Sequence, residues 1–522
     1  MYKEMARYIL SHDIGTSGCK SALFDLDGRL LSSTSREYQI SYPMPGRAEQ
    51  NPEDWWDAVV LSTRDILKME RIISTEIAVV SFSGQMEDSI FLGRNHDVIR
   101  PAILHIDSRA NAEAEWLKEK LGEEKINALT GNFVDGECTL SKILWLKNNE
   151  PENFRQTKIF LSGAKDYIAL RFSKDHAYTD YVDASISFLL DIKKNDWCDL
   201  LLSQIGITKD NLPEVVPSST VIGQVSAEAA NKTGLACGTP LVVGAGDAGC
   251  AAVGAGSVQQ KDTCANIGSS SWVATISDHP LIGKPKGLYN LKHPDPSLFM
   301  PIGSVISAGH SYRWLAQLFG EAQVEKAESQ GVMKYSVMDK AAERVAPGSD
   351  GLIFLPYMMG ERTPHRDHDA RGVFFGLSLN HQRDHLIRAV LEGVAYGLRS
   401  VIDTFEEADL RISDVTVFGG GTKGSIWQEI IANVLEKKVT VPEILGEISC
   451  LGAAVIGGIG IGTYRSYAKA KELVRMQRTV YPDPAISRRY SDFYKVYLSL
   501  YPSLKPSFQE LAKVRESGSV RL

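Results

Sequence analysis

An acidic residue, two hydroxyl-bearing residues and two glycines follow the first apolar run of the chain. Asp13 stands after the run Tyr8–Leu10 and opens the segment Asp-Ile-Gly-Thr-Ser-Gly, which contains Thr16 and Ser17. A tight turn between two strands exposes backbone N–H groups, and such a concavity binds phosphate oxygens. A carboxylate at a strand end holds Mg²⁺ directly or through water. The segment predicts a phosphate-binding turn with Asp13 as the metal-associated acid, although an Asx-type β-turn would use the same residues.

A second acidic residue, Asp247, follows the apolar run 240–246. Phosphoryl transfer needs little covalent help from a protein, but it needs a positioned acceptor for the proton of the attacking hydroxyl. A single carboxylate fits that task, and the flanking glycines Gly246 and Gly249 would let a substrate approach the backbone. Taken alone, Asp247 is equally well explained as a helix N-cap. The predicted phosphate-binding segments elsewhere in the chain favour the role of general base over that of a helix cap.

Two glycine-containing segments in the second half of the chain have the composition of a nucleotide site. Gly268 and Ser269 open the run Gly-Ser-Ser-Ser, which predicts a second phosphate-binding turn. Gly420, Gly421 and Lys423 belong to the run Gly-Gly-Gly-Thr-Lys after an apolar strand, where a flat ligand such as adenosine could lie against the backbone. An ordinary serine turn and a flexible glycine loop are the alternatives.

A further polar group follows the apolar run 77–82. Gln85, Met86 and Glu87 come directly after it, and Asp107 follows at a second strand end. Amide and carboxylate side chains donate and accept the paired hydrogen bonds that sugar hydroxyls require. We therefore expect these residues to bind a sugar, with solvated loop charge as the alternative.

Strand and helix patterns alternate along the chain between these residues. This alternation predicts an α/β protein whose strands and helices position them. Residues 8–24 and 263–272 share the plan strand, Gly/Ser turn, strand. This repeat predicts two related halves, with a domain at 1–256, a domain at 257–522 and a cleft between them. Two unrelated β-hairpins would give the same pattern. Helices are expected at residues 52–70, 249–256, 385–406, 425–435 and 450–458, with a peripheral helical extension from about 480 onward.

The bulk composition is that of an ordinary enzyme. The chain has 522 residues, 43% hydrophobic and 23% charged, which permits a large core. A net charge of −7 without a basic run argues against nucleic acid as a partner. The seven cysteines form no CxxC pair, which argues against a disulfide framework and a zinc site. No apolar stretch approaches 18 residues and no P-loop is present, so we expect a cytoplasmic protein without membrane partners.

Three longer motifs show that the chain resembles the FGGY family of carbohydrate kinases over roughly residues 8–480. One runs Thr139-x-x-Lys142-Ile-x-Trp145-Leu. Another runs Gly372-x-Phe374-x-Gly376-Leu377 and, seven residues later, His385-Leu386-x-x-Ala389-Val390-Leu391-Glu392. The third is Leu355-Pro-Tyr357-x-x-Gly360-Glu361-Arg362-Thr363-Pro364. The resemblance implies a two-domain α/β fold of the actin/hexokinase/Hsp70 (ribonuclease H-like) class, with a central cleft for ATP and a sugar.

The resemblance also implies roles for individual residues. Asp247 matches the general base and Asp13 the Mg-associated acid. ATP contacts are implied for Thr16, Ser17, Gly268, Ser269, Gly420, Gly421 and Lys423. Sugar contacts are expected from Gln85, Met86, Glu87, Asp107 and Asp247.

Within the family the chain is most similar to the xylulokinase branch, so a ketopentose such as D-xylulose is the favoured acceptor. The substrate loop departs from that branch, because Met86-Glu87 stands where Met-His is usual. Glu137 also departs from the pattern, at a position where the family usually has an aromatic or small residue. Another ketose or polyol, and a catalytically silent sensor of sugar or nucleotide, stay open, and an actin-like ATPase is disfavoured. Small-molecule sugar and ATP are the expected partners, and a homodimer is the expected assembly.

Overall fold

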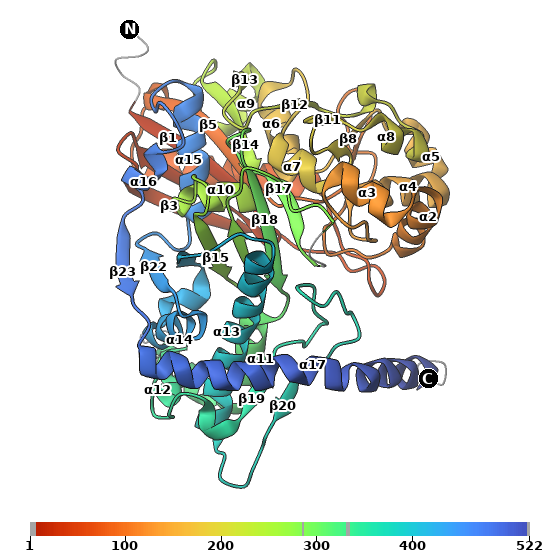
Figure 1. The fold of residues 1–522 in the computed structure, drawn as a ribbon. Coiled ribbons are helices and arrows are strands. Elements are labelled where there is room, and N and C mark those ends of the chain that lie inside the picture. Colours follow the sequence, from red (N-terminus) through yellow and green to blue (C-terminus); the bar gives the residue numbers. More distant parts are fainter. Residues whose placement is uncertain (1–6, 284–286, 330–334, 519–522) are drawn as a thin grey trace.

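The computed structural model describes residues 7–283, 287–329 and 335–518 and contains two large sheets, one above the other in Figure 1. The upper sheet belongs to the N-terminal half, and its strands lie in the order β13-β14-β5-β1-β2-β3. They are β1 (Tyr8–Ile14), β2 (Gly18–Asp25), β3 (Leu30–Glu37), β5 (Ile77–Gly84), β13 (Val221–Gln224) and β14 (Pro240–Gly246).

The lower sheet, in the C-terminal half, has the order β17-β18-β16-β15-β21-β22-β23. Its strands are β15 (Thr263–Ile267), β16 (Ser271–Thr275), β17 (Tyr289–Lys292), β18 (Phe299–Val305), β21 (Asp414–Phe418), β22 (Lys438–Pro442) and β23 (Met476–Val480). In both sheets an antiparallel three-strand unit is followed by two parallel strands: β3-β2-β1 by β5 and β14, and β18-β16-β15 by β21 and β22. The predicted structural repeat is therefore confirmed.

Between β5 and β14 the chain builds a mostly helical lobe, visible at the upper right of Figure 1. Its helices are α2 (Asn111–Leu121), α3 (Glu123–Thr130), α4 (Thr139–Asn149), α5 (Pro151–Gln156), α6 (Ala164–Ser173), α7 (Tyr181–Ile186), α8 (Asp199–Ile205) and α9 (Ala227–Thr233). Short strand pairs brace it: β4 (Glu49–Gln50) with β7 (Ala102–Ile103), β6 (Ile90–Leu92) with β8 (Ile159–Leu161), β9 (Tyr178–Asp180) with β12 (Glu214–Val216), and β10 (Leu190–Asp191) with β11 (Asp196–Trp197).

Most predicted helices are confirmed, and their ends follow local rules. Helix α1 (Pro52–Met69) begins after Asn51, whose side chain accepts a hydrogen bond from the backbone N–H of Glu53, and it has proline at its first position. The long helix is α13 (Arg383–Glu407), and the helix predicted at 425–435 is α14 (Ser425–Leu435).

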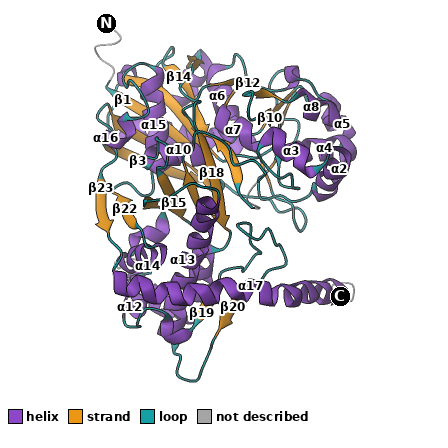
Figure 2. Cartoon of the chain, viewed as in Figure 1, coloured by secondary structure: helices purple, strands orange, loops and turns teal. Residues whose placement is uncertain are grey.

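Helices α11 (Ala308–Ser329), α12 (Ser336–Glu343) and α17 (Pro484–Gly518) pack around α13 (Figure 2). The short strands β19 (Ile353–Leu355) and β20 (Val373–Phe375) pair beside them, whereas the short helix α16 (Lys469–Leu473) precedes β23 at the upper left of the same view. Helix α17 is the predicted peripheral extension, and a row of its tyrosines packs on Tyr396 of α13. In the part of the chain that the structure describes, no helix combines the length and apolar character needed to cross a bilayer.

Two helices of small residues join the halves. Helix α10 (Asp247–Gly254) follows β14, and α15 (Ile448–Gly460) follows β22 and packs on β1, β5 and β14 of the other half. A Cβ atom added at Gly254 would lie 2.0 Å from the carbonyl oxygen of Ile448, and one at Gly452 would lie 1.8 Å from that of Cys250. Backbone meets backbone at this crossing, so only glycine fits.

We therefore predict that Gly452→Ala lowers the free energy of unfolding by about 2 kcal/mol or more, because the added methyl group forces α10 and α15 apart. Urea unfolding followed by circular dichroism measures the change. Gly446→Ala is the matched control, since its Cβ would meet only the Nζ atom of Lys20, at 3.7 Å. Equal stability of the two variants would contradict a tight crossing.

Candidate active site

The strand register brings three predicted site segments to one edge of the N-terminal sheet. Strands β1, β5 and β14 are parallel, with Ile14 opposite Gly84 and Gly84 opposite Gly246. Asp13, Gln85 and Asp247 therefore lie at the carboxyl ends of neighbouring strands. Ligands of open α/β sheets bind at such an edge.

Hydrogen bonds to its carbonyl oxygens fix the turn between β1 and β2. Tyr38 donates its hydroxyl to the carbonyl oxygen of Gly15, and the amide of Gln50 donates to that of Thr16 at 2.8 Å. The backbone N–H of Tyr38 donates to the carbonyl oxygen of Ser17 at 3.2 Å. Bonds on the carbonyl side hold the turn in one conformation, which is the pre-organisation that phosphate binding requires.

Asp13 is held by a single side-chain hydrogen bond within the sheet. The hydroxyl of Ser83 donates to its carboxylate at 2.7 Å. Burial raises the pKa of Asp13, while Ser83 and the charge of Lys20 lower it. No cluster of three or more metal-binding side chains occurs among the described residues. A site with one carboxylate fits Mg²⁺, which usually keeps several waters and binds through one or two carboxylates and substrate phosphates.

Asp247 is the first residue of α10 and is partly buried. Its pKa is raised to about 7, chiefly by burial and also by the negative charges of Asp13 and Asp88, while a backbone hydrogen bond from Ala248 lowers it. A carboxylate with a pKa near neutrality is well matched to accept a proton.

The glycines around Asp247 serve packing, which corrects the expectation that they open the backbone to substrate. Gly244 has φ +71 and its Cβ would lie 1.7 Å from the carbonyl oxygen of Phe82. A Cβ at Gly246 would lie 2.2 Å from the sulfur of Met86, and one at Gly249 would meet Val182 at 3.0 Å. The close contact at Gly246 places Met86 directly beside the residue that precedes Asp247.

A cavity of about 520 Å³ in the C-terminal half collects five of the residues predicted to bind ATP. Asn266 of β15 lies opposite Phe418 of β21, so the two glycine segments that follow these strands are neighbours. The five residues are Gly268, Ser269, Gly420, Gly421 and Lys423. Of the three consecutive glycines, Gly420 faces open space, whereas Gly421 packs against Ile267 and Trp427. Thr16 and Ser17 lie on the N-terminal half and do not line this cavity.

The same cavity contains residues that sequence reasoning missed. Tyr312 of α11 donates its hydroxyl to Asp339 of α12 at 2.7 Å, and Tyr312 packs against Trp427. A Cβ at Gly424 would lie 2.5 Å from a carboxylate oxygen of Asp339, so the Asp339 side chain packs closely against this glycine. No spacing pattern marks these residues, because helices distant in sequence bring them together.

The substrate loop is held by the first long motif. Lys142 of α4 is fully buried, and its ammonium donates to the carbonyl oxygens of Glu87 (3.0 Å) and Leu104 (2.8 Å). Thr139 donates its hydroxyl to the carbonyl oxygen of Asp88 at 2.8 Å. Glu87 has φ +63, a strained conformation for a residue with a side chain. The motif supports this strained backbone.

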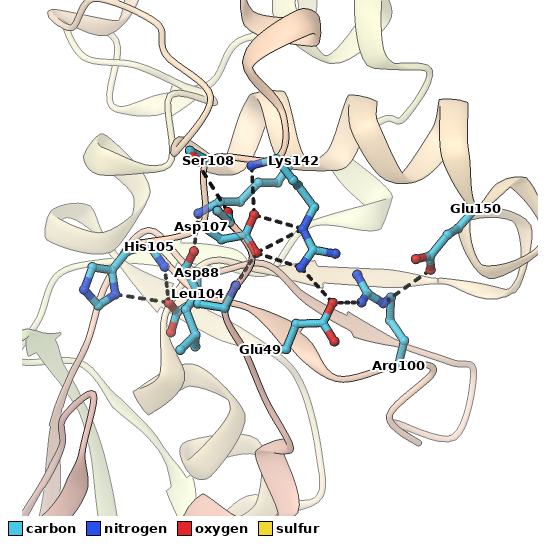
Figure 3. Close-up of polar contacts among 12 residues, drawn as sticks. Glu49, Asp88, Arg100, Leu104, His105, Asp107, Ser108, Lys142 and Glu150 are labelled. Carbon is cyan, nitrogen blue, oxygen red and sulfur yellow. Dashed lines mark hydrogen bonds and ion pairs between the residues drawn. The ribbon is translucent and has the colours of Figure 1, made fainter. Parts of the chain in front are cut away.

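Asp107 has a different environment from the other predicted sugar ligands. Both of its carboxylate oxygens accept hydrogen bonds from Arg109, and one also accepts from the backbone N–H of Ala48 at 2.6 Å. Arg109 also forms an ion pair with Glu49, and Glu49 forms a second ion pair with Arg100. Figure 3 shows these polar contacts around Glu49, Arg100 and Asp107. This geometry favours an indirect role, in which Asp107 fixes the loop, and its contact with a sugar stays a prediction.

Gln85 and Glu87 are buried and each retains an oxygen without a hydrogen-bond partner, Oε1 in both cases. Burial raises the pKa of Glu87 to about 8, with Asp135 as the next cause, while Lys142 and Arg362 lower it. Buried polar atoms without partners are rare and mark places where a ligand completes the hydrogen bonding.

Comparison with known proteins decides the family. The model of the N-terminal domain of the FGGY family of carbohydrate kinases matches residues 8–254, and the model of its C-terminal domain matches residues 264–461. The chain belongs to the FGGY family of carbohydrate kinases. It is therefore an ATP-dependent sugar kinase, as the sequence motifs predicted.

Similar FGGY kinases differ in the substrate that they are named for. The xylulose kinase of Bacillus subtilis is 30% identical, with 98% of this chain and 100% of the relative covered. The gluconokinase of the same organism is 31% identical, with 97% and 98% covered. The crystal structure of xylulose kinase from Rhodospirillum rubrum has a TM-score of 0.87 and 30% identity, covering 96% of this chain and 100% of that one. The predicted actin/hexokinase-like two-domain fold is confirmed, whereas the domain boundary near residue 256 stays a prediction.

The raised pKa of Glu87 predicts a pH-dependent stability. The folded pKa of about 8 exceeds the ordinary value of 4.5, so between these pH values the folded protein binds more protons than the unfolded chain. Its free energy of unfolding should therefore fall as pH rises through this window. Glu87→Gln has no carboxyl group to ionise at this position. Its free energy of unfolding, relative to that of wild type, should therefore be about 1–3 kcal/mol higher at pH 9 than at pH 5. Urea unfolding at both pH values measures this, with Glu119→Gln on the exposed face of α2 as control. Parallel pH profiles for wild type and Glu87→Gln would contradict it.

Proposed function

We propose that this FGGY kinase transfers the γ-phosphoryl group of ATP to a hydroxyl of a ketopentose such as D-xylulose, with Asp247 as the general base. The observation that carries the proposal is the convergence of Asp13, Gln85 and Asp247 at one sheet edge. A kinase for another ketose or polyol is the second candidate, because Glu87 replaces the histidine that is usual in the xylulokinase branch.

In this proposal the nucleotide lies in the cavity of the C-terminal half. The adenosine lies over the open face of Gly420, and the phosphates run past Gly268 and Ser269 toward Thr16 and Ser17 on the other half. Asp13 holds Mg²⁺, which neutralises charge on the phosphates when it is bound. Closure of the two halves on both substrates would exclude water from the cleft.

Asp247 supplies the acid–base step. Its carboxylate accepts the proton of the acceptor hydroxyl as oxygen bonds to phosphorus, and ADP leaves. Gln85 and Glu87 orient the other hydroxyls through their unpartnered oxygens. Thr139 and Lys142 act indirectly, because they hold the loop backbone that carries Glu87.

A coupled assay of ADP release with a panel of ketoses and polyols tests the proposal. We expect D-xylulose or a related uncharged acceptor to stimulate ADP release at least tenfold over the rate without acceptor. ADP release that no sugar changes would contradict the proposed function.

A substitution tests the base. Asp247→Asn removes the proton acceptor but keeps the shape, so turnover should fall by a factor on the order of 10²–10⁴ while ATP binding persists. Asp199→Asn is the matched control, since Asp199 is likewise the first residue of a helix, α8, and its side chain is exposed. Steady-state kinetics and ATP titration measure both effects. Near-normal turnover in Asp247→Asn would remove this residue from the mechanism.

A further inference from the structure

An ion pair between the two halves lies beside the substrate loop. Glu137, which departs from the family pattern, pairs with the guanidinium of Arg362. Glu137 precedes α4 in the N-terminal half, whereas Arg362 belongs to the third long motif, after β19 in the C-terminal half. Both side chains are partly buried, with 19% and 30% of their surface exposed.

A hydrogen bond places this pair beside the loop that carries Glu87. Thr139, two residues after Glu137, donates its hydroxyl to the carbonyl oxygen of Asp88, which follows Glu87. Burial is the largest cause that raises the pKa of Glu87, the charge of Asp135 raises it further, and the charge of Arg362 lowers it. Asp135 accepts hydrogen bonds from the backbone N–H groups of Glu137 (3.0 Å) and Cys138 (3.1 Å), so it belongs to the same turn as Glu137. Glu87 in turn follows Met86, which packs on Gly246 beside the proposed base. The ion pair therefore lies beside the loop that carries Glu87.

The cations around Glu87 are already bound by protein groups. Glu137 occupies Arg362, and Lys142 donates to two backbone carbonyls. Arg366 donates to the carbonyl oxygen of Phe133 at 3.2 Å and lies 3.8 Å from Asp135. A carboxylate on the acceptor would have to displace one of these partners.

The neighbouring acidic groups add repulsion. Asp88 is fully buried and Asp135 is partly buried, and their negative charges add to burial, the largest cause, in raising the pKa of Glu87. Like charges in a partly buried site repel far more strongly than in water. Hydroxyl groups, in contrast, can donate to these carboxylates.

We propose that the acceptor is an uncharged sugar or polyol, and that Glu137 is the specificity-determining residue that excludes sugar acids by occupying Arg362. The proposal rests on the proposed kinase function and deepens it, because relatives of similar identity are named for xylulose and for gluconate. Without Glu137, the guanidinium of Arg362 would be free to form a bidentate pair with the carboxylate of a sugar acid.

The test compares kcat/KM for uncharged acceptors (D-xylulose, xylitol) and sugar acids (D-gluconate, D-xylonate). Wild type should favour the best uncharged acceptor over the best sugar acid by at least about tenfold, a free-energy difference that one unpaired charge readily supplies. The ratio of kcat/KM for the best sugar acid to kcat/KM for the best uncharged acceptor should rise at least about tenfold in Glu137→Gln. The double variant Glu137→Gln/Arg362→Gln should lose this gain. Glu152→Gln, which removes an exposed pair with Arg155, is the control and should leave the ratio unchanged.

The outcomes separate the two proposals. Higher kcat/KM for a sugar acid in wild type would overturn the inference and leave the kinase function standing. An unchanged ratio in folded Glu137→Gln would overturn the role of Glu137. Calorimetric titration of wild type with D-gluconate needs no variant: saturation at micromolar concentration would contradict exclusion, and its absence alongside D-xylulose binding would support it. Turnover with neither class would refute the proposed function itself.

Discussion

The site depends on the close approach of α10 and α15. The backbone contacts at Gly254 and Gly452 bring the helix that begins at Asp247 against a helix that packs on the sheet of the other half. Because backbone atoms meet there, the separation of the halves at this point is set by van der Waals contact between backbones and not by adjustable side chains. The strand edge that carries Asp13 and Asp247 is thereby joined to the half that contains the cavity proposed for the nucleotide. A kinase needs this arrangement, since its two substrates must meet in line.

The second constraint is the support of a strained loop. Glu87 keeps a left-handed backbone while its side chain lies in a site with two other acids, and each feature alone opposes folding. Lys142 and Thr139 bind the carbonyl groups of the loop from α4, and Asp107 and Arg109 fix its second arm. The long motif that begins at Thr139 thus has a physical reason, because its residues hold in place the backbone of the loop proposed to bind the acceptor.

Much of the scaffold could be predicted from the sequence because its signals are local. Apolar runs that end before Asp13, Ser83 and Asp247 mark strand ends, and Pro52 marks the start of α1. The repeat of strand, turn, strand predicted the second sheet. What could not be predicted depends on packing between distant segments: Asp339 reaches the cavity from α12, and Asp107 is occupied by Arg109. The glycines beside Asp247 looked like openings for substrate, whereas partners such as Phe82 and Val182, which no local pattern reveals, fill those spaces.

The most direct measurement is a crystal structure of the complex with a non-hydrolysable ATP analogue and the acceptor that turns over fastest. The acceptor hydroxyl should lie about 2.6–3.2 Å from a carboxylate oxygen of Asp247. The terminal phosphate analogue should lie on the far side of that hydroxyl, with the nucleotide against Gly268 and Gly420. An acceptor bound with no hydroxyl near Asp247, or a nucleotide bound outside this cavity, would contradict the account.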